Sequence, residues 1–158
     1  MSLPSRPAAV LMERRAIANR WVSEVWTPVA VIEQEGDEGG APVLVERDEA
    51  RERWLHPGFS VGLFRDEAEG YYLNLTTDTP FAFVEWEARE DGAVPLWVTL
   101  SYNEAARRMD GGALVEGVPM PPDWLPWVAE FTETHFKPPK KKERIRPPSF
   151  KGARRDES

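Results

Sequence analysis

The chain has 158 residues, of which 41% are hydrophobic, so it is long enough to bury one core and short for two. It contains no cysteine, which excludes disulfides, thiolate metal sites and cysteine nucleophiles and fits a reducing compartment. No stretch approaches the roughly 20 apolar residues that span a bilayer, and the first apolar run is too short for a secretory signal. We therefore expect a cytoplasmic protein without a membrane span.

The formal net charge of −7 is an average over two parts of opposite sign. Residues 136–158 hold nine Lys and Arg and three Asp and Glu, a net charge of +6, which leaves −13 for residues 1–135. All five lysines lie between Lys137 and Lys151. Because an acidic body repels phosphate groups, we expect nucleic-acid binding only if the basic C-terminal part provides it.

Two strands are predicted near the N-terminus, within residues 8–15 and 20–35, from their apolar and β-branched runs. Pro28 cannot donate a ladder hydrogen bond, so the second strand is expected at a sheet edge or a bulge. Residues 33–42 are glycine-rich and acidic, and we predict a loop there. Residues 43–58 are ambiguous between extended structure and a helical turn.

Four further strands are predicted from alternating side chains, at residues 59–64, 71–76, 81–88 and 96–102. Short turn sequences separate them and leave no room for crossover helices, so we expect an antiparallel sheet. Residues 81–88 alternate imperfectly, and a bulge or twist near Val84 would bring their apolar side chains to one face.

Two helices are predicted after the last of these strands. Ser101 and Glu104 match a capping box at the start of the first helix, which ends at a Gly-Gly pair. Asp123 is the expected N-cap of the second helix, which extends to His135. Its apolar residues recur with helical spacing, and we expect the most buried of them to be Trp124, Trp127 and Phe131.

These elements predict an α+β fold in a single domain at residues 8–135. We expect an antiparallel sheet of six or more strands, bent or half-barrelled, with a C-terminal helix packed on it. Residues 1–7 are expected to be disordered. The basic, proline-rich tail at residues 136–158 is also expected to be disordered, because it can bury too little apolar surface to offset its ordering entropy.

No residue pattern predicts catalysis, a metal site or a cofactor. His56 precedes a Pro-Gly pair that we interpret as a turn, and His135 ends a helix, so neither has a ligand partner at usable spacing. Glu85 and Glu87 point to the same strand face, but alternating glutamates on a solvent face are the simpler interpretation of that pair. The sequence has no glycine-rich phosphate loop and no nucleophile elbow.

Partner binding is predicted instead, at the tail and at two tryptophans. Trp21 and Trp26 are five residues apart, so an unbroken strand points them to opposite faces. One of them belongs to the core, and the other is either covered or an exposed anchor for a partner. The basic residues that we expect to contact an acidic protein surface are Lys137, Lys140, Lys141, Lys142, Arg144 and Arg146.

Four segments resemble an uncharacterised bacterial family, domain of unknown function 3305: residues 12–32, 71–86, 98–112 and 115–136. The resemblance rests on Arg-Trp, then Trp-x-Pro-Val-Ala-Val, then Val-Pro-Met-Pro before a Trp-bearing helix. Members of that family look like small cytoplasmic proteins encoded beside formate dehydrogenase and its maturation factors. The resemblance implies a role in assembly or maturation of a molybdenum-dependent formate dehydrogenase, and it implies no catalytic residues.

Three functions are compatible with the sequence. The first is a non-enzymatic accessory protein whose tail binds an acidic surface of a formate dehydrogenase subunit or maturation factor. The second is a small carboxylate-dependent enzyme acting on a pterin or nucleotide precursor, and the third is weak, salt-sensitive nucleic-acid binding through the tail. A further alternative for the tail is that it lies on its own acidic body.

Overall fold

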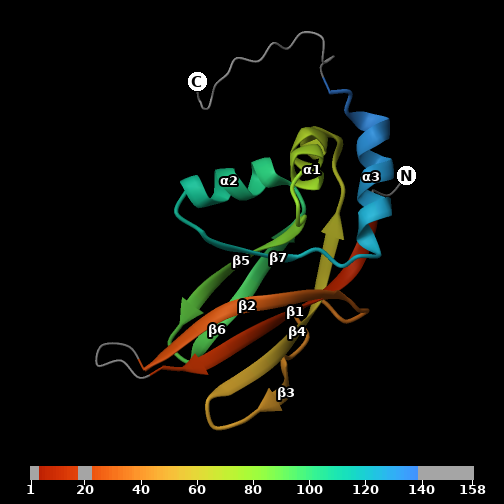
Figure 1. Cartoon of the computed structure of the whole chain (residues 1–158). Helices are drawn as coiled ribbons and strands as arrows, with labels where there is room; N and C mark the ends of the chain where they lie inside the picture. Colours follow the sequence, from red (N-terminus) through yellow and green to blue (C-terminus); the bar gives the residue numbers. More distant parts are fainter. Residues whose placement is uncertain (1–3, 18–22, 139–158) are drawn as a thin grey trace.

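The computed structural model describes residues 4–17 and 23–138, which form seven strands and three α-helices (Figure 1). The strands are β1 (Ser5–Ala16), β2 (Glu24–Glu33), β3 (Val43–Arg47), β4 (Arg51–Gly62), β5 (Phe81–Arg89), β6 (Gly92–Thr99) and β7 (Leu114–Pro119). The helices are α1 (Ala68–Leu75), α2 (Tyr102–Asp110) and α3 (Trp124–His135), with a 3-10 turn η1 (Arg65–Glu67) before α1. Every strand pairing is antiparallel, which confirms the predicted α+β class.

The strands form two sheets, which we call sheet A, in the order β2-β1-β4-β3, and sheet B, in the order β6-β5-β7. β2 of sheet A lies against β7 of sheet B, and β4 lies against β6. The sheets also contact each other through β1 and β6 and through β2 with β5 and β6, in a bent arrangement that does not close into a barrel. We call the two outer contacts the β2–β7 seam and the β4–β6 seam. The three α-helices gather at one end of the sheets, where α1 and α3 pack together (Figure 1).

β1 and β2 confirm the two N-terminal strands. β2 is an outer strand of sheet A, and its pairing register with β1 shifts next to Pro28, between Leu11 and Met12. Pro28 thus lies both at an edge and at a bulge, where its missing N–H is tolerated. β1 begins at Ser5, so the prediction of disorder for residues 1–7 is wrong for residues 5–7, which pair with β4.

α1 occupies residues that were predicted to form a strand, and it lies between β4 and β5, where the sequence left no room for a helix. Its buried residues include Ala68, Tyr71 and Asn74, which follow helical spacing. Asn74 interrupts the apolar pattern, yet its side chain is buried because the interior supplies its partners. The amide donates to the carbonyl oxygens of Phe81 and Leu100, and its oxygen accepts from the N–H of Phe81.

α2 confirms the first predicted helix, including its cap. The Ser101 hydroxyl oxygen accepts a hydrogen bond from the N–H of Glu104, which is one half of the predicted capping box, whereas the Ser101 N–H donates to the hydroxyl of Thr99 and not to Glu104. The same hydroxyl donates to Glu67 at the start of α1. Gly70 lies directly against Ser101, where a Cβ would clash, so the lack of a side chain at Gly70 lets α1 approach the N-terminus of α2.

β7 is a strand that the sequence analysis missed. It lies between the two predicted helices in the chain and pairs with β5 on the side opposite β6. Gly117 and Pro119 obscured it, because both residue types are depleted in strands. As the outer strand of sheet B, β7 can accept a proline at its end.

α3 confirms the second predicted helix, but it is rotated relative to the expected stripe. Trp124, Val128 and Thr132 are its buried residues, at a spacing of four. Trp127 and Phe131 are only partly buried and pack against the margin of the core, so the prediction that they are among the most buried was wrong. None of the helices in the described residues is long and apolar enough to cross a membrane.

Candidate functional site

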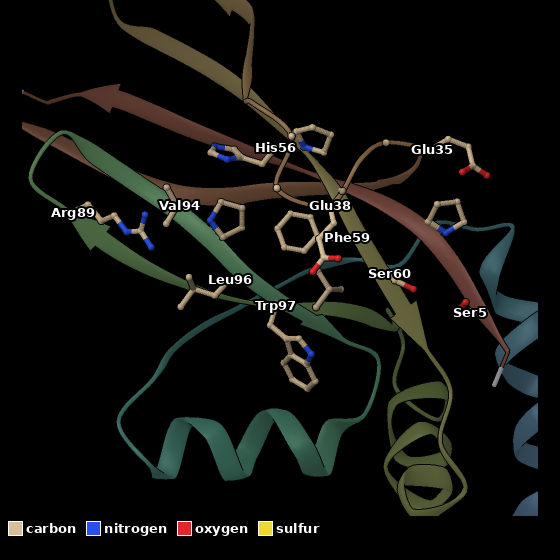
Figure 2. A pocket seen from close by; sticks show the side chains of 18 residues that line it. Ser5, Glu35, Glu38, His56, Phe59, Ser60, Arg89, Val94, Leu96 and Trp97 are labelled. Atoms are coloured by element: carbon tan, nitrogen blue, oxygen red, sulfur yellow. The ribbon is translucent and has the colours of Figure 1, made fainter. Parts of the chain in front are cut away.

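A groove runs along the seam between β4 and β6. Three adjoining hollows form it, with volumes of about 880, 320 and 390 Å³. The first of these, the central hollow, is lined by β4, β6 and the loop that follows β2 (Figure 2). It shares Ser60 and Trp97 with one neighbour and His56 and Val94 with the other, so the three hollows adjoin one another along β6. We refer to them together as the groove.

The groove exists because two strand edges that face each other do not pair. β3 pairs with β4 only as far as Leu55, so residues 56–62 have no strand on that side within the described part of the chain. β6 is the outer strand of sheet B. Pro57 and Pro95 lie on these two edges, and neither can donate a ladder hydrogen bond. The gap between the sheets is therefore lined by side chains and is not closed by a continuous ladder.

The loop between β2 and β3 forms one wall of the central hollow. It packs onto Gly58, which has a φ of +93° and lies so close to the Asp37 carbonyl that a Cβ would clash. The register of β4 against β1 shifts at this point, so the Pro-Gly pair forms a bulge inside a strand. The interpretation of that pair as a turn after His56 was wrong. The bulge lets the loop approach the strand.

Aromatic side chains line the central hollow. Figure 2 shows Phe59 between His56 and Arg89 toward one end and Ser60 toward the other. Trp97 lines the same hollow, and the guanidinium of Arg108 from α2 stacks on its ring, 3.4 Å from the centroid. That guanidinium is itself fixed by an ion pair with Glu85, at 2.5 Å. Trp97 is therefore held from behind while it lines the groove.

The second hollow, which we call the carboxylate hollow, lies between β6 and the starts of α1 and α2. Asp66, Glu67 and Glu104 line it together with Thr99. Burial raises the pKa of Glu104, and the hydroxyl of Thr99, which donates to its carboxylate at 3.0 Å, opposes that rise. Glu67 accepts from Ser101 at 2.7 Å and pairs with Arg107. The hollow thus presents carboxylates whose positions are fixed by capping and ion pairs.

The third hollow, the tryptophan hollow, lies at the opposite end of the groove. The Trp26 indole N–H donates to Glu24 at 2.9 Å, and the Trp54 indole N–H donates to Glu52 at 3.1 Å. Arg14 connects the two glutamates and, with Trp54, holds the pKa of Glu52 below its usual range. These five side chains are consequently partnered within the hollow, whereas Asp91, which also lines it, is exposed and has no basic partner in the described residues.

Acidic residues dominate the groove as a whole. Its ionised side chains comprise two arginines and eight carboxylates, a net charge of −6. Burial lowers the pKa of His56, so this histidine is neutral at pH 7 and adds no positive charge. The two basic residues are Arg14 and Arg89, and the eight acidic ones are Glu24, Glu35, Glu38, Glu52, Asp66, Glu67, Asp91 and Glu104. The groove can therefore attract a positively charged ligand.

The predicted partner-binding residues fall in three places. Trp26 lines the tryptophan hollow and also packs on Gly92 at the margin of the core, so it is partly core and partly groove. Lys137 is exposed just beyond α3. Phe136 packs on Tyr72 of α1, with ring centroids 5.1 Å apart, so the folded part continues past residue 135. Those outside the described residues are Trp21, Lys140, Lys141, Lys142, Arg144 and Arg146.

The remaining titratable candidates have structural partners. Glu85 pairs with Arg108, and Glu87 pairs with Arg89. His135 packs on the Phe131 ring at the end of α3. Among residues 4–17 and 23–138, no group of three metal-ligating side chains is arranged to hold an ion.

Sequence reasoning missed most of the groove. Glu67 and Glu104 are 37 positions apart, and Phe59 and Trp97 belong to different sheets, so no local spacing links them. The one local indication was the pair Pro57 and Gly58, which we assigned to a turn.

The comparisons with known proteins give one match. Residues 7–146 match a family described as protein of unknown function (DUF3305). No curated protein and no solved structure matches the chain.

Proposed function

The chain belongs to the DUF3305 family, and we propose that it is a non-enzymatic accessory protein that holds an extended polypeptide segment in the groove. The partner that we propose is a subunit or maturation factor of a molybdenum-dependent formate dehydrogenase, as the family resemblance implies. The basic tail is the second contact, with an acidic surface of the same partner.

The observation that supports this proposal best is the row of three adjoining hollows along β6. It follows β6, which has eight residues and hence a length of about 26 Å at 3.3 Å per residue. That length suits a segment of about eight extended residues, whereas a small metabolite would use a single hollow. Fixed aromatic rings at Phe59 and Trp97 offer anchor points of the kind that contribute most to protein interfaces.

The strand edges favour binding through side chains over addition of a strand. A segment that extended sheet A or sheet B would need donors and acceptors along the free edge. Pro57 and Pro95 remove donors from both edges, and the register of β6 shifts at Leu96. The groove is accordingly suited to a segment held by rings and charges.

Affinity capture with the full-length chain tests the proposal. The double variant F59A/W97A removes both rings from the groove, and L114A removes an apolar side chain that is 49% exposed on β7. We expect the wild type and L114A to recover formate dehydrogenase subunits or maturation factors, identified by mass spectrometry, and F59A/W97A to lose them. Equal recovery by all three would exclude the groove, and recovery of no such protein by the wild type would exclude the proposed partner.

One observation favours a second candidate, a carboxylate-dependent enzyme acting on a pterin or nucleotide precursor. Glu104 combines a raised pKa with a position beside Glu67 in a hollow of about 320 Å³, as general acids often do. Turnover of such a precursor by the wild type, lost in E104Q while the fold is retained, would support this activity over the binding role.

A further inference from the structure

We propose that the C-terminal segment, residues 139–158, docks in the groove of its own chain and competes there with the partner. The inference rests on the groove and on the sequence of the segment, so it holds whichever protein the partner is. It concerns a different contact from the one proposed for the tail in the partner complex. The chain would exchange a contact within itself for a contact with another protein.

Charge complementarity is the first argument. Residues 139–158 contain eight Lys and Arg and three Asp and Glu, a net charge of +5, against −6 in the groove. Glu35, Glu38 and Asp66 are exposed on the groove and have no basic partner in the described residues. They are therefore available to a basic segment, and the Debye length of about 8 Å at physiological ionic strength lets neighbouring charges act together.

The point at which the described chain ends is the second argument. Phe136 packs on Tyr72 of α1, and Glu67 of the carboxylate hollow lies five residues earlier, at the N-cap of that helix. Five helical residues correspond to an axial rise of about 7.5 Å. Residues 139–158 can extend over about 66 Å, which exceeds the roughly 26 Å length of β6 beside the groove. Tyr72 and Glu67 are also about 140° apart around the helix axis, so the segment must pass around α1 to reach the groove, and it is long enough to do so and to follow β6.

The composition of the segment matches the surface of the groove. Pro139, Pro147 and Pro148 have no N–H, so the segment, like the edges of β4 and β6, is poorly suited to ladder pairing and would bind through its side chains. Ile145 and Phe150 are its large apolar side chains, and the groove offers rings at Phe59 and Trp97 for them to contact. Lysine and arginine side chains can lay their aliphatic stems along such a surface while their charges meet the carboxylates.

Paramagnetic relaxation in the full-length chain tests the proposal. The natural chain has no cysteine, so S149C gives one attachment site for a nitroxide label next to Phe150. At low salt we expect the label to broaden the Trp97 indole N–H signal strongly and the Leu114 amide on the far edge of sheet B little. The difference should largely disappear at high salt, because the contact depends on charge.

Two charge variants with equal charge change separate the groove from the acidic body in general. E35Q/E38Q/D66N neutralises three of the four exposed groove carboxylates that have no basic partner in the described residues, the fourth being Asp91, and E69Q/E130Q/E133Q neutralises three exposed glutamates of α1 and α3 nearer the start of the segment. We expect the first to abolish the broadening at Trp97 and the second to retain it.

Three results would overturn the proposal. The first is that the label does not broaden the Trp97 indole N–H signal of the wild type at low salt. The second is that both charge variants lose this broadening equally. The third is that the broadening also appears when spin-labelled chains are mixed with isotope-enriched chains that carry no label. The last result would show that the contact forms between molecules. None of them bears on whether a formate dehydrogenase subunit is captured, so this inference and the proposed function can fail separately.

Discussion

The two seams between the sheets differ in what covers them. At the end of the β2–β7 seam, Trp124 of α3 is fully buried and its indole N–H donates to Glu33 of β2 at 2.8 Å. At the β4–β6 seam, no helix of residues 4–17 and 23–138 covers Phe59 and Trp97 from the groove side, and both rings are partly exposed in that part of the chain. Both seams join the same two sheets, so the difference comes from the elements added around them. Covering a seam makes it part of the core, and leaving it open makes it a surface for binding.

Polar side chains near the helices and polar side chains on the groove also differ in whether they have partners inside the chain. Buried polar side chains near the helices, such as Asn74 and Ser101, have partners inside the chain. On the groove, Glu35, Glu38 and Asp66 face solvent. Partners inside the chain stabilise the fold, whereas exposed charges contribute little to it and are available to a ligand.

Replacement of tryptophan at each seam gives the largest expected effect. Trp124→Ala should lower the free energy of unfolding by about 3–5 kcal/mol, because a fully buried ring is removed and Glu33 loses a donor. Trp97→Ala should cost less than half as much, since its ring is partly exposed. Urea denaturation monitored by circular dichroism measures both. Equal losses would contradict the distinction between a closed and an open seam.

Asn74→Ala measures how much the buried side-chain hydrogen bonds near the helices contribute to stability. The change leaves the N–H and carbonyl of Phe81 and the carbonyl of Leu100 without their side-chain partner, at a site where Asn74 is 1% exposed. We expect a loss of about 1–3 kcal/mol in urea denaturation. Asn103→Ala, which changes a half-buried asparagine of α2, serves as the control and should have a smaller effect. A near-neutral Asn74→Ala would mean that water replaces these bonds.

Gly58→Ala alters the wall of the groove. Alanine is strained at a φ of +93°, and its Cβ would meet the Asp37 carbonyl, so the loop should move away from β4. We expect a stability loss of about 1–2 kcal/mol and faster amide hydrogen exchange at Gly40, whose N–H donates to Asp37. Gly112→Ala also changes a positive-φ glycine, but in open space, and should leave the loop unchanged. Unaltered exchange at Gly40 in G58A would contradict the packing of the loop on the bulge.

The pH dependence of His56 gives the smallest expected effect. Burial lowers its pKa in the folded state, so the unfolded chain binds the proton more tightly. Stability should therefore fall as the pH drops through the ordinary histidine pKa of about 6.5, by less than about 1 kcal/mol because the ring is only half-buried. Comparison of His56→Gln with the wild type at pH 5 and pH 8 measures this difference. A wild-type chain that becomes more stable than the variant on acidification would reverse the sign and place an acidic partner at His56.

Sequence reasoning worked best where local chemistry specifies an element. The capping pair Ser101 and Glu104 fixed the start of α2, and Pro28 indicated an edge or a bulge in β2. The imperfect alternation of residues 81–88 also has a counterpart, since the register of β5 against β6 shifts between Glu85 and Trp86. Each of these features depends on residues that are close in the chain.

The wrong secondary-structure predictions occurred where contacts with residues distant in the chain determine the element. Residues 71–76 alternate as a strand would, but Asn74 finds its partners on β5 and beyond β6, and those bonds stabilise a helix. The sequence of β7 does not predict a strand, because Gly117 and Pro119 are residue types depleted in strands. It forms a strand because β5 has an edge with which it can pair. Tertiary contacts outweighed local propensity in both cases.

The sequence by itself determined the α+β class, the antiparallel pairing, the two longer helices and the separation of an acidic body from a basic end, because these follow from periodicity, capping and composition. Only the tertiary structure decided that the strands divide into two sheets, that α3 covers one seam, and that the carboxylates of six elements and loops gather along the other. The physical reason is that a groove is made by edges that fail to pair, and whether two edges meet depends on the path of the whole chain.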